Sequence, residues 1–187
     1  MMITLVSEEI WEFDLKAALE EISEQRREQV LKFKHEQGQR LCVLAYQLLK
    51  QGLREAYGIT ENPIFEYNEH GKPSIVGHPE IFFNLSHSGD YAVCAFGDNP
   101  IGIDIQKIVP YNEKTAKRVC SFEEFEFIQK SCDKAEEFTK LWTKKEAVAK
   151  MEGTGISSCG IKTCTGGKRV KTFRFSDYFV SICEKAD

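Results

Sequence analysis

The chain has 187 residues, of which 42% are hydrophobic and 29% charged, and its formal net charge is −4. This balance is ordinary for a soluble globular protein, and the absence of a basic excess argues against a general nucleic-acid binder. No apolar run approaches the roughly 18 residues that span a bilayer, and the acidic start is unlike a signal peptide. The seven cysteines form no CxxC pair, so we expect free thiols and a cytoplasmic location.

The first half of the chain predicts helices followed by strands. Residues 23–34 and 36–57 have the composition of helices, and the leucines of the second recur with the spacing of a core-facing stripe. Gly58 is in position to end that helix. The strands are short apolar runs bounded by turn residues: 3–6, 64–67, 81–85, 91–96 and 101–105. We expect the last three to form an antiparallel meander.

The second half repeats this order of elements. Residues 115–118 favour a helix, and Ser121 is a good N-cap for another. Residues 136–151 predict a longer helix, and Gly153, Gly155 and Gly160 indicate a loop after it. The chain then ends in a predicted hairpin, with strands at 172–175 and 178–183.

A faint internal echo links the two halves. The segment Ser-Gly-Asp-Tyr-Ala-Val-Cys at 88–94 is similar to Ser-Asp-Tyr-Phe-Val-Ser at 176–181, and both halves place helices before a terminal hairpin. Short strands resemble each other by chance, so the echo alone is weak. It nevertheless suggests a pseudo-duplicated α+β chain, with halves at 1–108 and 109–187 and a site in the cleft between them.

The helix at 136–151 places three chemically distinct side chains on one face. Trp142, Glu146 and Lys150 lie four residues apart, so an aromatic ring, a carboxylate and an ammonium follow one another at each turn. A second carboxylate, Asp104, lies in an alternating run with Ile103 and Ile105 on the opposite face. Asp104 either faces solvent or meets a cation, because an unpaired buried carboxylate is costly.

Four segments, taken together and in this order, resemble the Sfp-type 4′-phosphopantetheinyl transferases. They are Gly-Lys-Pro at 71–73, Phe-Asn-Leu-Ser-His-Ser-Gly at 83–89, Ile-Gly-Ile-Asp-Ile at 101–105 and Trp-Thr-Lys-Lys-Glu-Ala-Val-Ala-Lys at 142–150. The resemblance runs from about Arg26 to the C-terminus. It implies a two-halved fold and a Mg²⁺-dependent holo-[acyl-carrier-protein] synthase activity. Such an enzyme moves phosphopantetheine from coenzyme A to a serine of an acyl or peptidyl carrier protein and releases 3′,5′-ADP.

The resemblance also assigns roles to residues of the second half. Asp104 and Glu146 would be metal ligands, and Glu146, or a water that it orients, would deprotonate the attacking serine. Lys150 would bind the pyrophosphate, and Trp142 would pack the helix against the core. Many family members carry a glutamate where this chain has Gln106, so the amide would be a weaker, uncharged third ligand.

Six residues of the first half would contact coenzyme A by the same resemblance: Arg26, Arg40, Lys72, Pro73, Ser86 and His87. Lys72 and Pro73 would border the adenine and its phosphates, and Ser86 and His87 would hold the 3′-phosphate. A lone histidine after a strand is more often structural, but an exposed loop between strands is where binding residues concentrate. Arg40 could equally cap a helix or form a surface pair.

Two other functions compete with the transferase. A non-catalytic binding module for coenzyme A or a carrier protein would need a damaged catalytic set, which only Gln106 suggests. A metal-dependent pyrophosphate hydrolase could use the same two carboxylates. The length favours the monomeric class of the family, with no membrane or nucleic-acid partner. Phe122, Phe125 and Phe127 could contact the carrier or could belong to the core.

Overall fold

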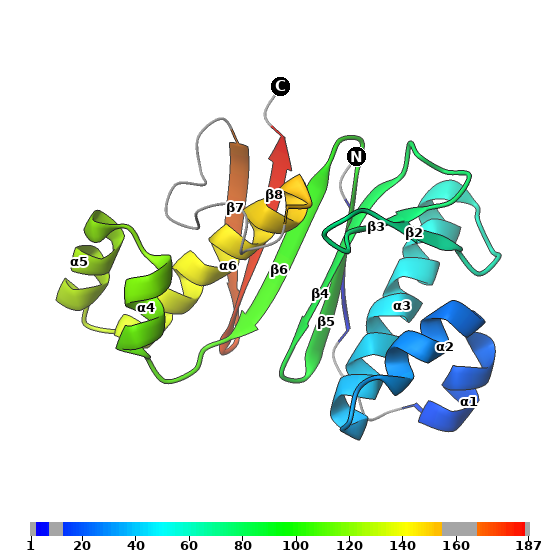
Figure 1. Ribbon diagram of the computed structural model, residues 1–187, viewed down its shortest axis with the longest axis horizontal. Helices are drawn as coiled ribbons and strands as arrows, with labels where there is room; N and C mark the ends of the chain where they lie inside the picture. Colours follow the sequence, from blue (N-terminus) through cyan, green and yellow to red (C-terminus); the bar gives the residue numbers. More distant parts are fainter. Residues whose placement is uncertain (1–2, 8–12, 155–167, 186–187) are drawn as a thin grey trace. The chain divides into compact units, whose positions relative to one another are not determined.

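The computed structural model describes residues 3–7, 13–154 and 168–185, and the chain divides into two compact units, Met1–Asp98 and Asn99–Asp187 (Figure 1). The sequence predicts a boundary at residue 108, which differs from this division by one strand. That strand, β6 (Ile101–Lys107), lies in the second unit because it pairs with β8 (Tyr178–Lys185).

The first unit consists of one long helix packed on a three-stranded sheet. The helix α3 (Glu36–Tyr57) has the predicted bounds, and Gly58 ends it in the left-handed conformation at φ 69°. The remaining elements are β1 (Ile3–Ser7), α1 (Leu15–Glu21), α2 (Glu24–Leu31), β2 (Phe65–Tyr67), β3 (Pro73–Ile75), β4 (Phe82–Ser88) and β5 (Tyr91–Gly97). The sheet is antiparallel in the order β1-β5-β4, and β2 and β3 form a separate hairpin.

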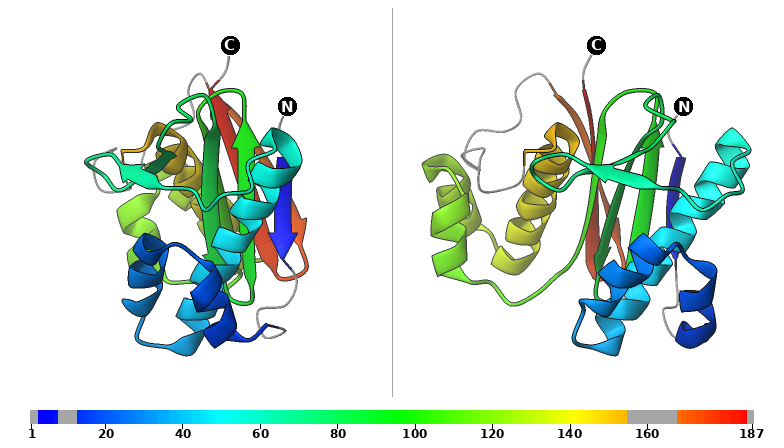
Figure 2. Two further views of the ribbon diagram at one scale, coloured as in Figure 1. Left: turned by 90° about the vertical axis from the view of Figure 1, so that its right-hand side faces the viewer. Right: turned by 45° about the vertical axis from the view of Figure 1, so that its right-hand side comes forward.

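The second unit has the same plan. Its sheet is antiparallel in the order β6-β8-β7, where β7 is Lys168–Phe175, and α6 (Lys134–Glu152) lies along one face of it (Figures 1 and 2). Two shorter helices, α4 (Glu113–Val119) and α5 (Phe122–Lys130), lie near the N-terminal end of α6. Ser121 caps α5 in a capping box with Glu124, which confirms the predicted helix start.

The shared plan confirms the predicted pseudo-duplication. In each unit the first strand pairs with the last strand of a C-terminal hairpin, and the long helix precedes that hairpin. The two echoing segments occupy equivalent positions, because Tyr91 begins β5 and Tyr178 begins β8. The echo is therefore a trace of the repeated unit.

Other predictions differ from the structure. The expected meander of three strands is wrong, because β4 and β5 form a hairpin whereas β6 pairs with β8, far along the chain. Two elements were not predicted from the sequence: the short strand β3, and α1, which Asp14 caps by accepting hydrogen bonds from two backbone amides. Gly155 and Gly160 of the predicted loop lie outside the described residues. In the part of the chain that the structure describes, no helix has both the length and the hydropathy needed to cross a membrane.

Candidate active site

The second unit brings the strand and helix motifs into contact through a glycine. A Cβ atom on Gly102 would collide with the carbonyl oxygen of Ala147 and with the backbone nitrogen of Met151, so the backbone of α6 rests directly on β6. Residues two apart on a strand share a face, and Asp104 therefore points to the side that α6 covers. Gly102, the glycine in Ile-Gly-Ile-Asp-Ile, therefore allows β6 and α6, which carry the candidate site, to approach each other closely.

Asp104 lies in this contact and meets a cation, which is one of the two outcomes that its sequence context allowed. Its side chain is buried, and its Oδ1 accepts a hydrogen bond of 2.7 Å from the Nζ of Lys150. Lys150 lies in the last turn of α6, where a cation also complements the helix dipole. The pair joins β6 to α6 and brings together two residues that the sequence assigns to the site.

Glu146 is one turn before Lys150 on the same helix, and its environment is electrostatically unusual. Burial, and then repulsion from Asp104, raise the pKa of Glu146 to about 7, although Lys150 acts in the opposite direction. A carboxyl group that titrates near neutral pH can accept a proton during turnover. The repulsion also shows that the two carboxylates are close enough to interact, and a bound cation would relieve it.

A row of buried hydroxyl groups lies beside Asp104 and beneath α6. Ser181 lies on β8 and is the register partner of Asp104 on β6 and of Thr172 on β7. Its hydroxyl lies 2.9 Å from the hydroxyl of Thr172 and 2.9 Å from that of Thr143 on α6. Thr143 and Ser181 are fully buried. The hydrogen bond between these two hydroxyl groups fixes the rotation of α6 about its own axis. In this orientation Glu146 and Lys150 lie on the side of the helix where Asp104 is.

The donor set fits a small hard cation. Asp104 and Gln106 lie on the same face of β6, and the amide nitrogen of Gln106 donates to the carbonyl of Lys107, which leaves Oε1 outside that bond. Among the described residues, no three acidic, histidine or cysteine side chains gather into a metal site. Mg²⁺ keeps several waters and needs only one or two protein carboxylates. Asp104 and Glu146 would supply that number of carboxylates, and Gln106 would add a neutral oxygen.

Two other residues of the Trp-Lys-Lys-Glu helix have structural roles. Trp142 packs beside Phe138 in the apolar cluster of α4, α5 and α6, as the sequence predicts. Lys145 is 5% exposed, and its Nζ is 2.7 Å from Glu124 Oε2. The burial of Lys145 could not be predicted from the sequence, because a lysine in a buried ion pair and a solvent-exposed lysine have the same spacing along a helix.

The predicted coenzyme A residues lie in the first unit, and its two arginines bond within that unit. Arg26 donates to the carbonyl of Cys42 on α3 and lies over the ring of Tyr46. Arg40 donates to the carbonyl of Phe13 and pairs with Glu36. Both arginines therefore also stabilise the packing of the helices around α3.

The other four predicted residues lie on neighbouring strands and turns. Lys72 closes the turn between β2 and β3, and Pro73 begins β3. Ser86 and His87 belong to β4, which corrects the expectation that they stand in a loop; the strand continues to Ser88, where the hairpin turns. Because strand residues alternate, Ser86 is buried whereas His87 is exposed and has its ring 6.3 Å from that of Phe33.

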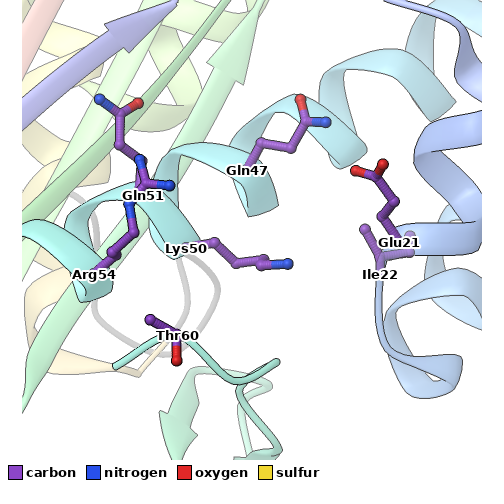
Figure 3. A pocket seen from close by; sticks show the side chains of 7 residues that line it. All are labelled: Glu21, Ile22, Gln47, Lys50, Gln51, Arg54 and Thr60. Carbon is purple, nitrogen blue, oxygen red and sulfur yellow. The ribbon is translucent and has the colours of Figure 1, made fainter. Parts of the chain in front are cut away.

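The first unit also contains a concavity of about 380 Å³ that lies away from all of these residues (Figure 3). One face of α3 contributes most of its lining, and Glu21, Ile22 and Thr60 complete it. None of the residues that the sequence assigns to the site lines this concavity. The concavity therefore gives no support to the predicted site.

Known sequences place the chain in a family. Residues 100–183 match the family described as the 4′-phosphopantetheinyl transferase superfamily, and residues 10–98 match the one described as 4′-phosphopantetheinyl transferase, N-terminal. The chain belongs to the 4′-phosphopantetheinyl transferase superfamily. The match to the superfamily contains Asp104, Glu146 and Lys150.

Individual relatives agree with this assignment. The chain is 37% identical over 139 residues to 4′-phosphopantetheinyl transferase Sfp of Bacillus subtilis (strain 168), over 73% of this chain and 62% of Sfp. It is 39% identical over 121 residues to psf-1 of Bacillus pumilus (63% and 52%) and 36% identical over 101 residues to HetI of Nostoc sp. (50% and 43%). The matched part thus spans less than two thirds of the length of each relative.

Proposed function

We propose that this protein transfers the 4′-phosphopantetheine group of coenzyme A to a serine of an apo acyl or peptidyl carrier protein. The observation that carries the proposal is the trio Asp104, Glu146 and Lys150, held together by the close contact of β6 and α6. The named relatives, each called a 4′-phosphopantetheinyl transferase, support the same reaction.

The proposed reaction is a displacement at phosphorus. The carrier serine hydroxyl attacks the phosphorus that bears the pantetheine arm, a new P–O bond forms, and the bond to the adenosine phosphate breaks to release 3′,5′-ADP. Glu146, or a water that it orients, takes the serine proton, for which a pKa of about 7 is suitable. Lys150 places its ammonium beside the pyrophosphate and offsets the charge that develops there.

We propose Mg²⁺ as the metal, with Asp104 and Glu146 as its ligands and Gln106 as a neutral third ligand. Bound Mg²⁺ would supply charge neutralisation at the pyrophosphate oxygens. Lys150, which pairs with Asp104 in this structure, holds the carboxylate in place and compensates its charge. The amide of Gln106 brings no charge, so we expect metal binding that is weaker than with a third carboxylate.

In the first unit we propose that His87 and Ser86 hold the 3′-phosphate of coenzyme A and that Lys72 and Pro73 border the nucleotide. His87 is exposed on β4, which suits contact with a ligand. Arg26 and Arg40 would add positive charge near the same ligand. Both already bond backbone carbonyls, so their replacement would also loosen the helices around α3.

We propose that the carrier protein docks on α5. Phe122 is 77% exposed and Phe127 is 62% exposed, whereas Phe125 packs against the apolar cluster of α4 and α6. Of the three phenylalanines, two are therefore available to a partner and one belongs to the core. Two large exposed aromatic rings on one short helix are typical of an interaction surface. We further propose that the protein acts as a monomer in the cytoplasm.

The products distinguish this proposal from its two alternatives. The protein is incubated with coenzyme A, Mg²⁺ and several unrelated apo carriers, and the nucleotides and carriers are separated by chromatography. We expect 3′,5′-ADP in amounts equal to the modified carrier. Release of 3′,5′-ADP without a modified carrier would identify a hydrolase, and bound but intact coenzyme A would identify a binding module.

A further inference from the structure

Lys145 precedes Glu146 in the sequence but points to a different part of the second unit. It is 5% exposed, its Nζ donates a 3.1 Å hydrogen bond to the carbonyl of Val119, and the same atom is 2.7 Å from Glu124 Oε2. Val119 is the last residue of α4, and Glu124 lies in the first turn of α5. One ammonium therefore joins three helices.

The acceptor in this contact also organises the start of α5. Glu124 Oε2 accepts a 2.7 Å hydrogen bond from the backbone nitrogen of Ser121, and the Ser121 hydroxyl accepts one of 3.2 Å from the nitrogen of Glu124. The carboxylate that holds Lys145 is thus the one that closes the capping box. Movement of α5 along α6 would break the ion pair, because the capping box holds the carboxylate of Glu124 at the start of α5.

Apart from a hydrogen bond of 2.9 Å from the Nζ of Lys134 in α6 to the Oε1 of Gln129 in α5, the two helices meet through an apolar cluster. Ile128 of α5 packs in a cluster with Phe138 and Trp142 of α6. Apolar side chains of this kind tolerate small displacements, whereas a buried ion pair must keep its geometry to offset the cost of burial. The position of α5 along α6 is therefore set by Lys145 more than by the apolar cluster.

This link runs between the proposed docking surface and the proposed base. Phe122 follows Ser121 directly and is the most exposed of the large apolar side chains on α5, and Lys145 is bonded through the backbone to Glu146. We infer that Lys145 is a positioning residue that fixes the carrier-docking helix relative to Glu146, so that a docked carrier presents its serine to the base. The inference rests on the proposed function.

The test compares Lys145→Met with Lys140→Met. Lys140 lies on the same helix, but its side chain is 40% exposed and pairs with Glu137 at 3.8 Å, so its variant controls for the loss of an ordinary ion pair. Transfer is measured with a folded apo carrier and with an unstructured peptide that spans the same serine, together with binding of coenzyme A. For Lys145→Met we expect kcat/KM to fall by about 10²-fold with the folded carrier, the scale expected for small misplacement of reacting groups. We expect much less change with the peptide and none in coenzyme A binding.

Two further variants strengthen the test. Lys145→Arg keeps the charge and should recover part of the loss with the folded carrier. Glu124→Gln removes the partner charge but keeps a side-chain oxygen that can accept the hydrogen bond from the Ser121 nitrogen. This variant should reproduce the effect if Lys145→Met fails to fold.

Three results would overturn the inference. The first is equal losses with carrier and peptide, which would indicate a general structural role, and the second is a carrier activity of Lys145→Met that matches Lys140→Met. The third is a wild-type protein that modifies neither the carriers nor the peptide. Only this third result contradicts the proposed function as well, so the two failures are distinguishable.

Discussion

The two units share one topology but differ in what they place between helix and sheet. In the first unit, Cys94 of β5 pairs with Leu85 of β4. Ser181 occupies the equivalent position in the second unit, where its register partners are Thr172 and Asp104. An apolar pair in one unit therefore corresponds to a polar group in the other. The first unit has the larger apolar core. The second unit instead buries polar groups beside its candidate site, although burying polar groups costs free energy.

A glycine at the helix–sheet contact shows the same difference. In the first unit Gly52 belongs to α3, and a Cβ there would meet the ring of Phe96, so the glycine makes room for an aromatic side chain. In the second unit Gly102 belongs to the strand, and the backbone of α6 itself occupies the space. The contact in the second unit is closer, and it brings Glu146 and Lys150 to Asp104.

The largest effect is expected for Glu146→Ala. Loss of the base and of one metal ligand should lower the transfer rate by at least roughly 10²–10⁴-fold, the usual contribution of general base catalysis alone. The fold should persist, because removing a carboxylate that repels Asp104 relieves strain in the apo protein. Single-turnover transfer and circular dichroism check the two statements, and retained turnover would remove Glu146 from both roles.

The two glycines offer a direct comparison of the units. Gly102→Ala should push α6 away from β6 and cost about 1–3 kcal/mol of stability by overpacking, with a large loss of activity in the molecules that remain folded. Gly52→Ala should destabilise by a similar amount but leave the activity per folded molecule nearly unchanged. Urea unfolding and active-site titration measure both quantities. Equal losses of specific activity would contradict the distinction between the units.

Lys150→Met should separate charge from metal binding. Lys150 lowers the pKa of Glu146, so its removal should raise that pKa further above about 7. A metal ion needs the ionised carboxylate, and Mg²⁺ affinity should therefore begin to rise at a higher pH than in the wild type. Calorimetric titrations with Mg²⁺ across a pH series give the two midpoints, and coincident midpoints would show that Lys150 does not act on Glu146. Transfer should also slow strongly, while the metal still binds at high pH.

The same pKa has a consequence for stability without metal. The Glu146 carboxyl group titrates at about 7 in the folded protein and near 4.5 when unfolded, so it favours the folded state most below pH 4.5. Its contribution should fall as the pH rises from about 4.5 to 7. Glu146→Gln should flatten this part of the stability profile, and an unchanged slope would contradict the raised pKa.

The smallest effects are expected at positions that adjust binding. His87→Ala should weaken coenzyme A binding and change kcat little, because His87 is proposed to hold the 3′-phosphate and not the reacting groups. The opposite pattern, with kcat lowered and binding intact, would contradict its assignment to the 3′-phosphate. Equilibrium dialysis and steady-state kinetics separate the two.

Gln106→Glu should tighten the metal site modestly by adding a third carboxylate beside Asp104. The measurement is the Mg²⁺ concentration that gives half-maximal transfer, which should be lower in the variant. A wild-type requirement that is no weaker than that of Gln106→Glu would show that the amide contributes as much as a carboxylate.

The sequence predicted local features well and pairing between distant segments less well. The bounds of α3, its glycine end and the capping box at Ser121 are local, because each depends on residues within a few positions. The pairing of β6 with β8 depends on segments some 75 residues apart, and the apolar pattern of β6 gave no sign of its partner. Proximity along the chain favoured β5 instead, which proved wrong.

The candidate site shows the same limit. Helical spacing placed Glu146 and Lys150 on one face. The apolar context of Asp104 allowed either solvent or a cation partner, and did not show that Lys150 would be that partner. The roles of Gly102, Ser181 and Lys145 depend on contacts across elements, which spacing does not reveal. An interrupted apolar alternation, as at Gly102, was the one available signal of close approach.

Asp104, Glu146 and Lys150 are proposed to carry out a metal-dependent transfer of phosphopantetheine to a carrier protein. The most direct test is intact-mass spectrometry of an apo carrier protein after incubation with this protein, coenzyme A and Mg²⁺, beside EDTA and Glu146→Ala controls. The carrier should gain one phosphopantetheine group only with Mg²⁺ and the wild-type protein. No gain on several unrelated carriers, or an equal gain with EDTA or with Glu146→Ala, would contradict it.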